Sequence, residues 1–118
     1  MHSSDLNVDH RRIHESVVTA CRPLPNATTK TIISFETLSS TEWQSTSFGT
    51  FFNPNYFVDI SPYLETKLLA LKSYQSEMRD WPHPRSYEAV RTQALYRGSQ
   101  VGLHAAEAFV LIRSVICN

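Results

Sequence analysis

The chain of 118 residues has only two cysteines and three glycines, and it lacks any long apolar run. Cys21 and Cys117 lie far apart in the sequence, so neither a disulfide-rich scaffold nor a C-x-x-C metal motif is expected. The longest apolar run, Ala108 to Ile112, is much shorter than the roughly 20 residues needed to cross a bilayer. The polar N-terminus has no signal-peptide pattern. A reduced, cytoplasmic protein without a membrane partner is therefore expected.

An excess of one charge is also missing, because 11 basic and 11 acidic residues cancel. A strongly one-signed surface draws proteins to nucleic acid or to anionic membranes, so neither is expected as the main partner. The chain does have a globular composition, with 42% apolar and 19% charged residues. Its length suits one hydrophobic core, which predicts a single domain over residues 1–118.

The first half of the chain predicts one helix and one strand before a long loop. Apolar residues recur at helical spacing over residues 10–21, and Asp9 is a plausible N-cap. The β-branched and aromatic run within residues 29–38 is typical of a strand buried on both faces. Residues 39–55 are rich in Ser, Thr, Gly, Asn and Pro, which predicts a loop. The aromatic residues interleaved in it suit the wall of a site: Trp43, Phe48, Phe51 and Phe52.

The second half predicts a strand, two helices and a final strand. A short strand is expected over residues 56–60, and a helix with leucines on one face begins at Ser61. A further helix is capped by Ser86 and ends near Gly102, and residues 107–116 form the last strand. This order of elements predicts an α/β sandwich with a largely parallel sheet.

His10 and His14 are four residues apart in the predicted first helix and therefore share one of its faces. Zinc proteases use this spacing in H-E-x-x-H, where the glutamate acts as the general base. Arg11 occupies the position of that glutamate here, so a protease is not expected. Two interpretations of the histidines stay open: metal ligands, or side chains that are packed or hydrogen-bonded at the start of a helix.

A wider pattern favours the first interpretation. The chain contains, in this order, the segments DLNVDHRRIHESVVTACRP, STEW, FVDIS, LETKLLAL, PHPRS, YRGSQVG and AEAFVL. Together, over nearly the whole chain from Asp5 onward, they resemble the PIG-L/LmbE-like family of zinc-dependent N-deacetylases. The resemblance implies a three-layer α/β/α sandwich that is Rossmann-like. It also implies zinc-dependent removal of an N-acetyl group from an amino sugar or glycoside, such as an N-acetylglucosamine derivative.

The segment DLNVDH is similar to the H-x-D-H metal motif of that family. The resemblance assigns His10 as a zinc ligand and Asp9 as a carboxylate that orients and tunes the histidine. Asn7 stands where the family has its first histidine. An amide can donate a hydrogen bond to an oxyanion but cannot deliver a proton at neutral pH, so this departure implies a different proton donor or a low activity.

The family's other motif, of the H-P-D-D type, does not occur in these 118 residues. It supplies the remaining metal ligands and the general base, so the chain is expected to be the C-terminal portion of a deacetylase that is incomplete by itself. Zinc would then bind weakly or not at all. A homo-oligomer or a complementary N-terminal half is a possible partner. The alternative is a non-catalytic fragment or degenerate module that dimerises or binds a sugar.

Four further residues are candidate contacts to the amino-sugar or glycoside substrate. Trp43 could stack on a sugar ring or simply anchor its loop. Glu36 and Glu42 could bind substrate hydroxyl groups, although solvated carboxylates are the commoner case. Arg85 could hold an anionic group of the substrate or form an internal ion pair.

Overall fold

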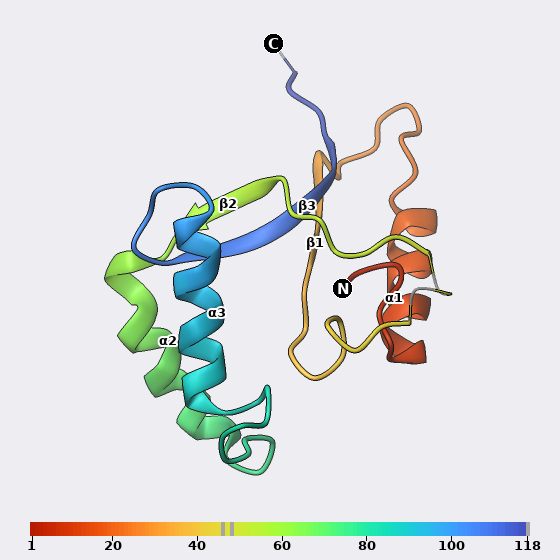
Figure 1. The fold of residues 1–118 in the computed structure, drawn as a ribbon. Coiled ribbons are helices and arrows are strands. Elements are labelled where there is room, and N and C mark those ends of the chain that lie inside the picture. Colours follow the sequence, from red (N-terminus) through yellow and green to blue (C-terminus); the bar gives the residue numbers. More distant parts are fainter. Residues whose placement is uncertain (46, 48, 118) are drawn as a thin grey trace. The chain divides into compact units, whose positions relative to one another are not determined.

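A computed structural model describes residues 1–45, 47 and 49–117 of the chain (Figure 1). In chain order the elements are α1 (Val8–Ala20), β1 (Thr31–Phe35), β2 (Tyr56–Asp59), the 3-10 helix η2 (Ser61–Tyr63), α2 (Leu64–Ala70), the 3-10 helix η3 (Leu71–Tyr74), α3 (Tyr87–Ser99) and β3 (Ala106–Ser114). This succession confirms the predicted order of helices and strands, and the fold is mixed α/β. Phe48, predicted as part of a site wall, lies outside the described residues.

The chain forms two compact units. The first unit consists of Met1–Tyr56 and Phe109–Asn118, and the second unit consists of Phe57–Ala108. The strands form one sheet in the order β1-β3-β2. The predicted single domain stays a prediction, as does the three-layer Rossmann-like sandwich. None of the helices in the described part of the chain is long and apolar enough to span a membrane.

Helix α1 of the first unit begins before the predicted start because its N-cap is Asn7 and not Asp9. The side-chain oxygen of Asn7 accepts a hydrogen bond from the backbone N–H of Asp9 at 2.9 Å. Asp9 therefore lies in the first turn, where a carboxylate favours the positive end of the helix dipole. No residue of α1 is fully buried, so the helix rests on the unit with a partly solvated apolar face.

Strand β1 pairs with β3 in the antiparallel direction, so the predicted largely parallel sheet is wrong for this pair. The strand is also buried on one face only. Ile32 and Ser34 are buried, whereas Ile33 and Phe35 are exposed. Such alternation is the ordinary pattern of a half-buried strand in an antiparallel sheet, and the prediction of burial on both faces is wrong.

In the second unit the two α-helices form a small apolar core. Leu64 and Leu68 of α2 are buried, as are Val90 and Ala94 of α3. The predicted cap of α3 is confirmed, because the hydroxyl of Ser86 accepts a hydrogen bond from the backbone N–H of Ala89 at 3.1 Å.

Gly98, in the last turn of α3, packs closely against the chain that follows the helix. A Cβ atom at this position would lie 2.7 Å from the backbone oxygen of Leu103 and 2.8 Å from the backbone of Ala105. The predicted helix extends only to Ser99, because the chain turns there and Gly102 adopts a positive φ of 74°.

Candidate functional site

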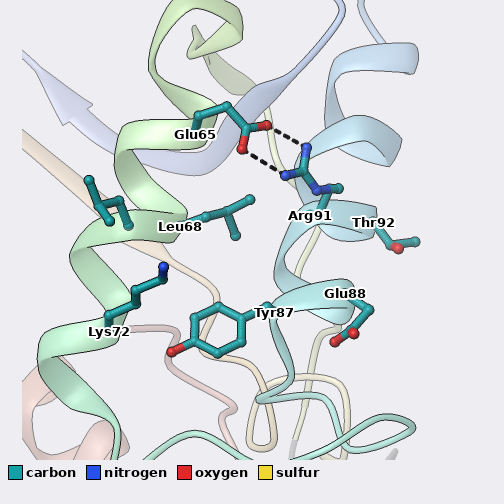
Figure 2. A pocket seen from close by; sticks show the side chains of 8 residues that line it. Glu65, Leu68, Lys72, Tyr87, Glu88, Arg91 and Thr92 are labelled. Carbon is teal, nitrogen blue, oxygen red and sulfur yellow. Dashed lines mark hydrogen bonds and ion pairs between the residues drawn. The ribbon is translucent and has the colours of Figure 1, made fainter.

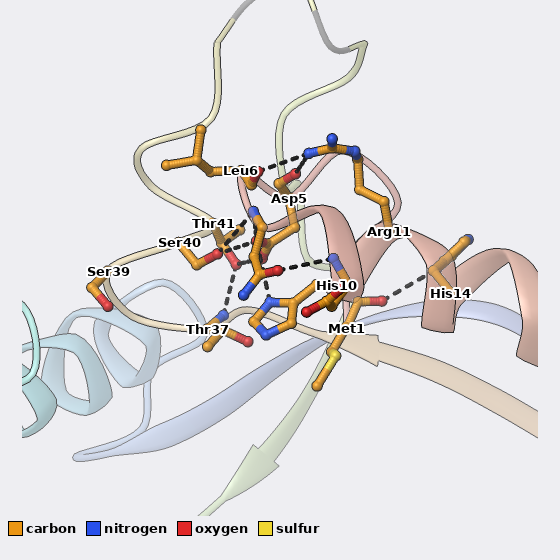
Figure 3. A network of polar contacts seen from close by, with 12 residues as sticks. Met1, Asp5, Leu6, His10, Arg11, His14, Thr37, Ser39, Ser40 and Thr41 are labelled. Carbon is orange, nitrogen blue, oxygen red and sulfur yellow. Dashed lines mark hydrogen bonds and ion pairs between the residues drawn. The ribbon is translucent and has the colours of Figure 1, made fainter. Parts of the chain in front are cut away.

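A buried carboxylate, that of Asp5, organises the polar centre of the first unit (Figure 3). The side chain is 0% exposed, and its Oδ1 accepts a short hydrogen bond from the hydroxyl of Ser40 and one of 2.9 Å from the backbone N–H of Asn7. Oδ2 accepts a hydrogen bond of 2.8 Å from the hydroxyl of Thr41. The imidazole Nδ1 of His10 lies 3.2 Å from Oδ1. Asp5 is thus shared by the turn before α1, the helix itself and the loop after β1.

The surroundings of Asp5 favour its charged form. Burial by itself would raise the pKa of this carboxyl, but the hydrogen bonds from Ser40, Asn7 and Thr41, together with the close imidazole of His10, outweigh burial and lower the pKa. Asp5 is therefore ionised at neutral pH and places a fixed negative charge next to the imidazole.

The two histidines that share a face of α1 have different partners. His10 meets the carboxylate of Asp5, and its side chain is 16% exposed. The ring Nδ1 of His14 lies 3.2 Å from the backbone oxygen of Met1. Figure 3 shows the two rings at separate places along the helix, each directed at its own partner. Their spacing alone therefore does not make a paired ligand set.

The two residues expected to assist His10 are both exposed. The carboxylate that the structure places against His10 is that of Asp5, while Asp9 stands in the first turn of α1 with an exposed side chain. Asn7 uses its amide oxygen to cap the helix, so the amide N–H₂ is the part of this side chain that can donate to a ligand. Their predicted roles stay predictions.

The loop after β1 holds three of the predicted substrate contacts. Glu36 directly follows β1 and is half-buried, and the Trp43 side chain is 50% exposed. The carboxylate of Glu42 accepts hydrogen bonds from the backbone N–H groups of Ser39 at 2.5 Å and Ser40 at 3.3 Å. Glu42 thus stabilises the turn that presents Ser40 to Asp5. Of the three, Trp43 offers the most accessible surface for a ligand.

Arg85, the fourth predicted contact, belongs to the second unit. Its guanidinium lies 2.7 Å from the carboxylate of Glu77, which is the internal ion pair that the sequence left open. The backbone N–H of Arg85 donates to the Nδ1 atom of His83 at 3.0 Å. Both contacts hold together the turn between η3 and α3.

The second unit also contains an open groove between α2 and α3, with a volume of about 710 Å³ (Figure 2). Glu65 and Arg91 form a bidentate ion pair across one end of it, with oxygen to nitrogen distances of 2.6 and 2.8 Å. Leu68 and Tyr87 provide apolar surface, and Lys72 and Glu88 provide further charges. None of the predicted site residues lines this groove.

The zinc expected from the sequence can be tested against the donors that are present. A catalytic zinc takes about three protein ligands of the nitrogen or oxygen type. His10 fits one such position, because a carboxylate beside a ligating imidazole is the usual arrangement. Within residues 1–45, 47 and 49–117, however, no group of three or more His, Cys, Asp or Glu side chains is placed to hold a metal ion. These residues fit one corner of a zinc site and not a whole site.

Several residues of this centre were not predicted as functional. They are Asp5, Arg11, Ser40 and Thr41. The guanidinium of Arg11 donates to the backbone oxygens of Asp5 at 2.6 Å and Leu6 at 2.8 Å, which fixes the turn before α1. A carboxylate five residues before a candidate ligand was a visible signal for Asp5. No local pattern connects it to hydroxyl groups 35 and 36 residues further along the chain.

The comparison with known proteins adds one partial relative. Diacetylchitobiose deacetylase from Thermococcus kodakarensis (strain ATCC BAA-918 / JCM 12380 / KOD1) is 34% identical to this chain over 77 residues. The chain is similar to a deacetylase over part of its length. The match covers 64% of this chain and 28% of the relative. No family model matches the chain, and no solved structure matches it.

Proposed function

We propose that this chain is part of a deacetylase, a hydrolase that removes an N-acetyl group from an amino sugar or glycoside. The 34% identity to a diacetylchitobiose deacetylase over 77 residues is the observation that carries the proposal. The resemblance of the chain's segments to the PIG-L/LmbE-like family agrees with it. The chain spans 28% of that relative, so the activity of a whole enzyme is proposed only with donors outside these 118 residues.

His10 is the proposed metal ligand in this chain. Zinc, when bound in a hydrolase, polarises an amide carbonyl and lowers the pKa of a coordinated water. The residues of this chain supply one imidazole for it, so the other ligands and the general base are proposed to come from a complementary N-terminal half. A carboxylate beside the ring, as Asp5 is, raises the basicity of an imidazole ligand.

Asn7 and Asp9 are proposed to assist from the start of α1. The amide N–H₂ group of Asn7 can donate a hydrogen bond to the oxygen that gains negative charge during amide hydrolysis. It cannot deliver a proton to the leaving amine. Asp9 has a solvated carboxylate in the first turn, and we propose that it tunes the site through its charge.

Trp43, Glu36 and Arg85 are the proposed substrate contacts. The exposed indole of Trp43 could stack on a sugar ring, with Glu36 nearby in sequence as an acceptor for hydroxyl groups. The same exposed indole supports the second candidate function, a non-catalytic module that binds a sugar.

Acetate release tests the proposal. The purified chain, supplied with zinc ions, is incubated with diacetylchitobiose or with N-acetylglucosamine, and acetate is quantified. We expect release only when a complementary N-terminal half that carries the missing ligands and the general base is added to the chain. This release should be lost in His10→Gln and kept in His104→Gln, a matched histidine substitution at an exposed position of the second unit. Equal activity in both variants would remove His10 from the proposed machinery.

Sugar binding separates the two candidate functions. Calorimetry with diacetylchitobiose at high concentration measures binding in the wild type and in Trp43→Ala. Binding that depends on Trp43 without any acetate release supports the non-catalytic module. The absence of both binding and acetate release contradicts both candidates.

A further inference from the structure

We propose that Asp5 is the positioning residue of His10: it fixes the imidazole as the Nδ1–H tautomer, so that the lone pair available for chemistry is on Nε2. This inference deepens the proposed function and rests on it for the use made of the lone pair. The tautomer itself can be measured without any metal, substrate or activity. The proposal replaces the sequence-based assignment of this orienting role to Asp9.

The carboxylate of Asp5 is held in a fixed position. Asp5 is fully buried, and three donors besides the imidazole hold it: the hydroxyls of Ser40 and Thr41 and the backbone N–H of Asn7. Fixed donors on both oxygens remove the freedom of the carboxylate to turn away from the ring. A group held in this way can orient a neighbour, whereas a mobile surface carboxylate cannot.

The imidazole of His10 has its Nδ1 atom next to this carboxylate. Nδ1 of His10 is buried and lies 3.2 Å from Oδ1 of Asp5, a contact that lacks the alignment of a hydrogen bond. A lone pair on Nδ1 would face the negative oxygen, which is repulsive, whereas an N–H there is attracted to it. Because Nδ1 is buried, the exposed 16% of the side chain lies on other atoms of the residue. The proton is therefore assigned to Nδ1.

The loop that carries Trp43 also supports this tautomer, because its hydroxyl groups hold Asp5. The hydroxyl of Thr41 donates to Asp5 and accepts the backbone N–H of Thr37 at 2.7 Å. Ser40 and Thr41 lie directly before the segment with Trp43, and Figure 3 shows both hydroxyl groups directed at the carboxylate. Loss of either hydroxyl should loosen Asp5 and weaken its hold on the ring.

Nitrogen-15 NMR of histidine-labelled protein measures the tautomer directly. At about pH 8 an ordinary histidine is neutral, and its protonated and unprotonated ring nitrogens have well-separated resonances. We expect Nδ1 of His10 to resonate as the N–H nitrogen and Nε2 as the bare one. Free histidine prefers the opposite tautomer. If His10 of the wild type has its proton on Nε2, the proposal is overturned, independently of the resonances measured in the variants.

The variants then identify the cause. Asp5→Asn should move the His10 resonances toward the Nε2–H tautomer, and Ser40→Ala and Thr41→Val should move them less in the same direction. Ser45→Ala is the matched control, because its hydroxyl is exposed and pairs with Ser47 at 2.6 Å. Asp9→Asn should leave the tautomer unchanged. A folded Asp5→Asn protein with wild-type resonances would contradict the proposal, as would a shift in Asp9→Asn alone.

The result is separable from the fate of the proposed function. If the chain releases no acetate but shows the Nδ1–H tautomer, the role of Asp5 is supported and the deacetylase function is contradicted. If it releases acetate with His10 as the Nε2–H tautomer, the deacetylase function is supported and the role of Asp5 is contradicted.

Discussion

Asp5 of the first unit and Glu65 of the second unit each meet a cationic or titratable side chain of another segment, and the two contacts differ most in burial. Asp5 and His10 are 0% and 16% exposed, whereas Glu65 and Arg91 are 75% and 44% exposed. The exposed pair has the better geometry, because two oxygens meet two guanidinium nitrogens. Loss of a partner should cost more stability in the buried pair, because no water can replace the missing partner there. Burial, and not the quality of the contact, decides what the loss of a partner costs.

The two carboxyl groups also reach a lowered pKa by different routes. The hydrogen bond from Arg91, helped by its charge, lowers the pKa of Glu65 at the surface. The pKa of Asp5 is lowered against an opposing effect of burial, by three hydrogen-bond donors together with the nearby imidazole of His10. Because water can replace a lost donor at Glu65 but not at the buried Asp5, removal of one donor should cost more free energy of unfolding at Asp5.

Asp5→Ala should have the largest effect on stability. It leaves the Ser40 and Thr41 hydroxyls without their acceptor in a buried place and removes one of the two acceptors of the Asn7 N–H. We expect a loss of about 3–5 kcal/mol in the free energy of unfolding, measured by urea denaturation followed by circular dichroism. Asp9→Ala, the matched control, removes an exposed carboxylate at the helix start and should cost less than about 1 kcal/mol. Equal losses would show that burial does not distinguish the two positions.

Gly98→Ala should have the next largest effect and should act on the second unit. The added Cβ would meet the backbone of Leu103 and Ala105 at 2.7 and 2.8 Å, and backbone atoms move less readily than a side chain. A cost of about 1–3 kcal/mol is expected in the same denaturation experiment. Thr92→Ala, at an exposed position of the same helix, should be neutral or slightly stabilising. A Gly98→Ala protein as stable as the wild type would mean that the helix end can shift outward freely.

Low pH should reduce the free energy of unfolding, because protonation of Asp5 removes its stabilising contribution. Its folded pKa is lowered, so the unfolded chain binds a proton first, near the usual Asp pKa of about 3.9. The contribution of Asp5 is therefore fully present above that pH and is lost as the pH falls through the folded pKa. The slope from this one group is at most about 1.4 kcal/mol per pH unit.

The difference between the wild type and Asp5→Asn isolates this group from the other carboxyls. Unfolding free energies measured from pH 6 downward should converge as the pH falls below about 4. A constant difference across the whole pH range would show that ionisation of Asp5 is not what stabilises the unit.

Glu65→Gln should have the smallest effect. The ion pair with Arg91 lies in water, where solvation compensates for most of the lost attraction. Thermal unfolding of this variant should be indistinguishable from that of the wild type, and 1 M salt should not change the comparison. A clear loss of stability would mean that the pair is coupled to the packing of α2 on α3.

The helices and strands could be predicted because their signals are local. The cap at Ser86 and the period of the leucines in α2 depend on residues within one or two turns. The direction of β1 could not be predicted, since it is set by pairing with residues about 80 positions away. The N-cap of α1 shows the same limit. Asn and Asp are equally good caps, and contacts of Asn7 with Asp5 and Ser40 select between them.

The sequence predicts the histidine of the candidate site, but it does not predict the residues that support this histidine. His10 stands out in the sequence through its spacing and through the family resemblance. Asp5 stands out only when Ser40 and Thr41 are brought to it across the fold, and this depends on the course of the loop after β1. The family resemblance points to the neighbouring carboxylate Asp9, because the H-x-D-H motif has its aspartate directly before the histidine.

The alternation along β1 has a consequence for handling the protein in solution. Ile33 and Phe35 are 38% and 42% exposed on a strand at the edge of the sheet, so part of their apolar surface is accessible to other molecules. Native edge strands usually suppress such adhesion with a charge or a proline, and β1 has neither. At high protein concentration we therefore expect self-association through Ile33 and Phe35, and Ile33→Lys should suppress it.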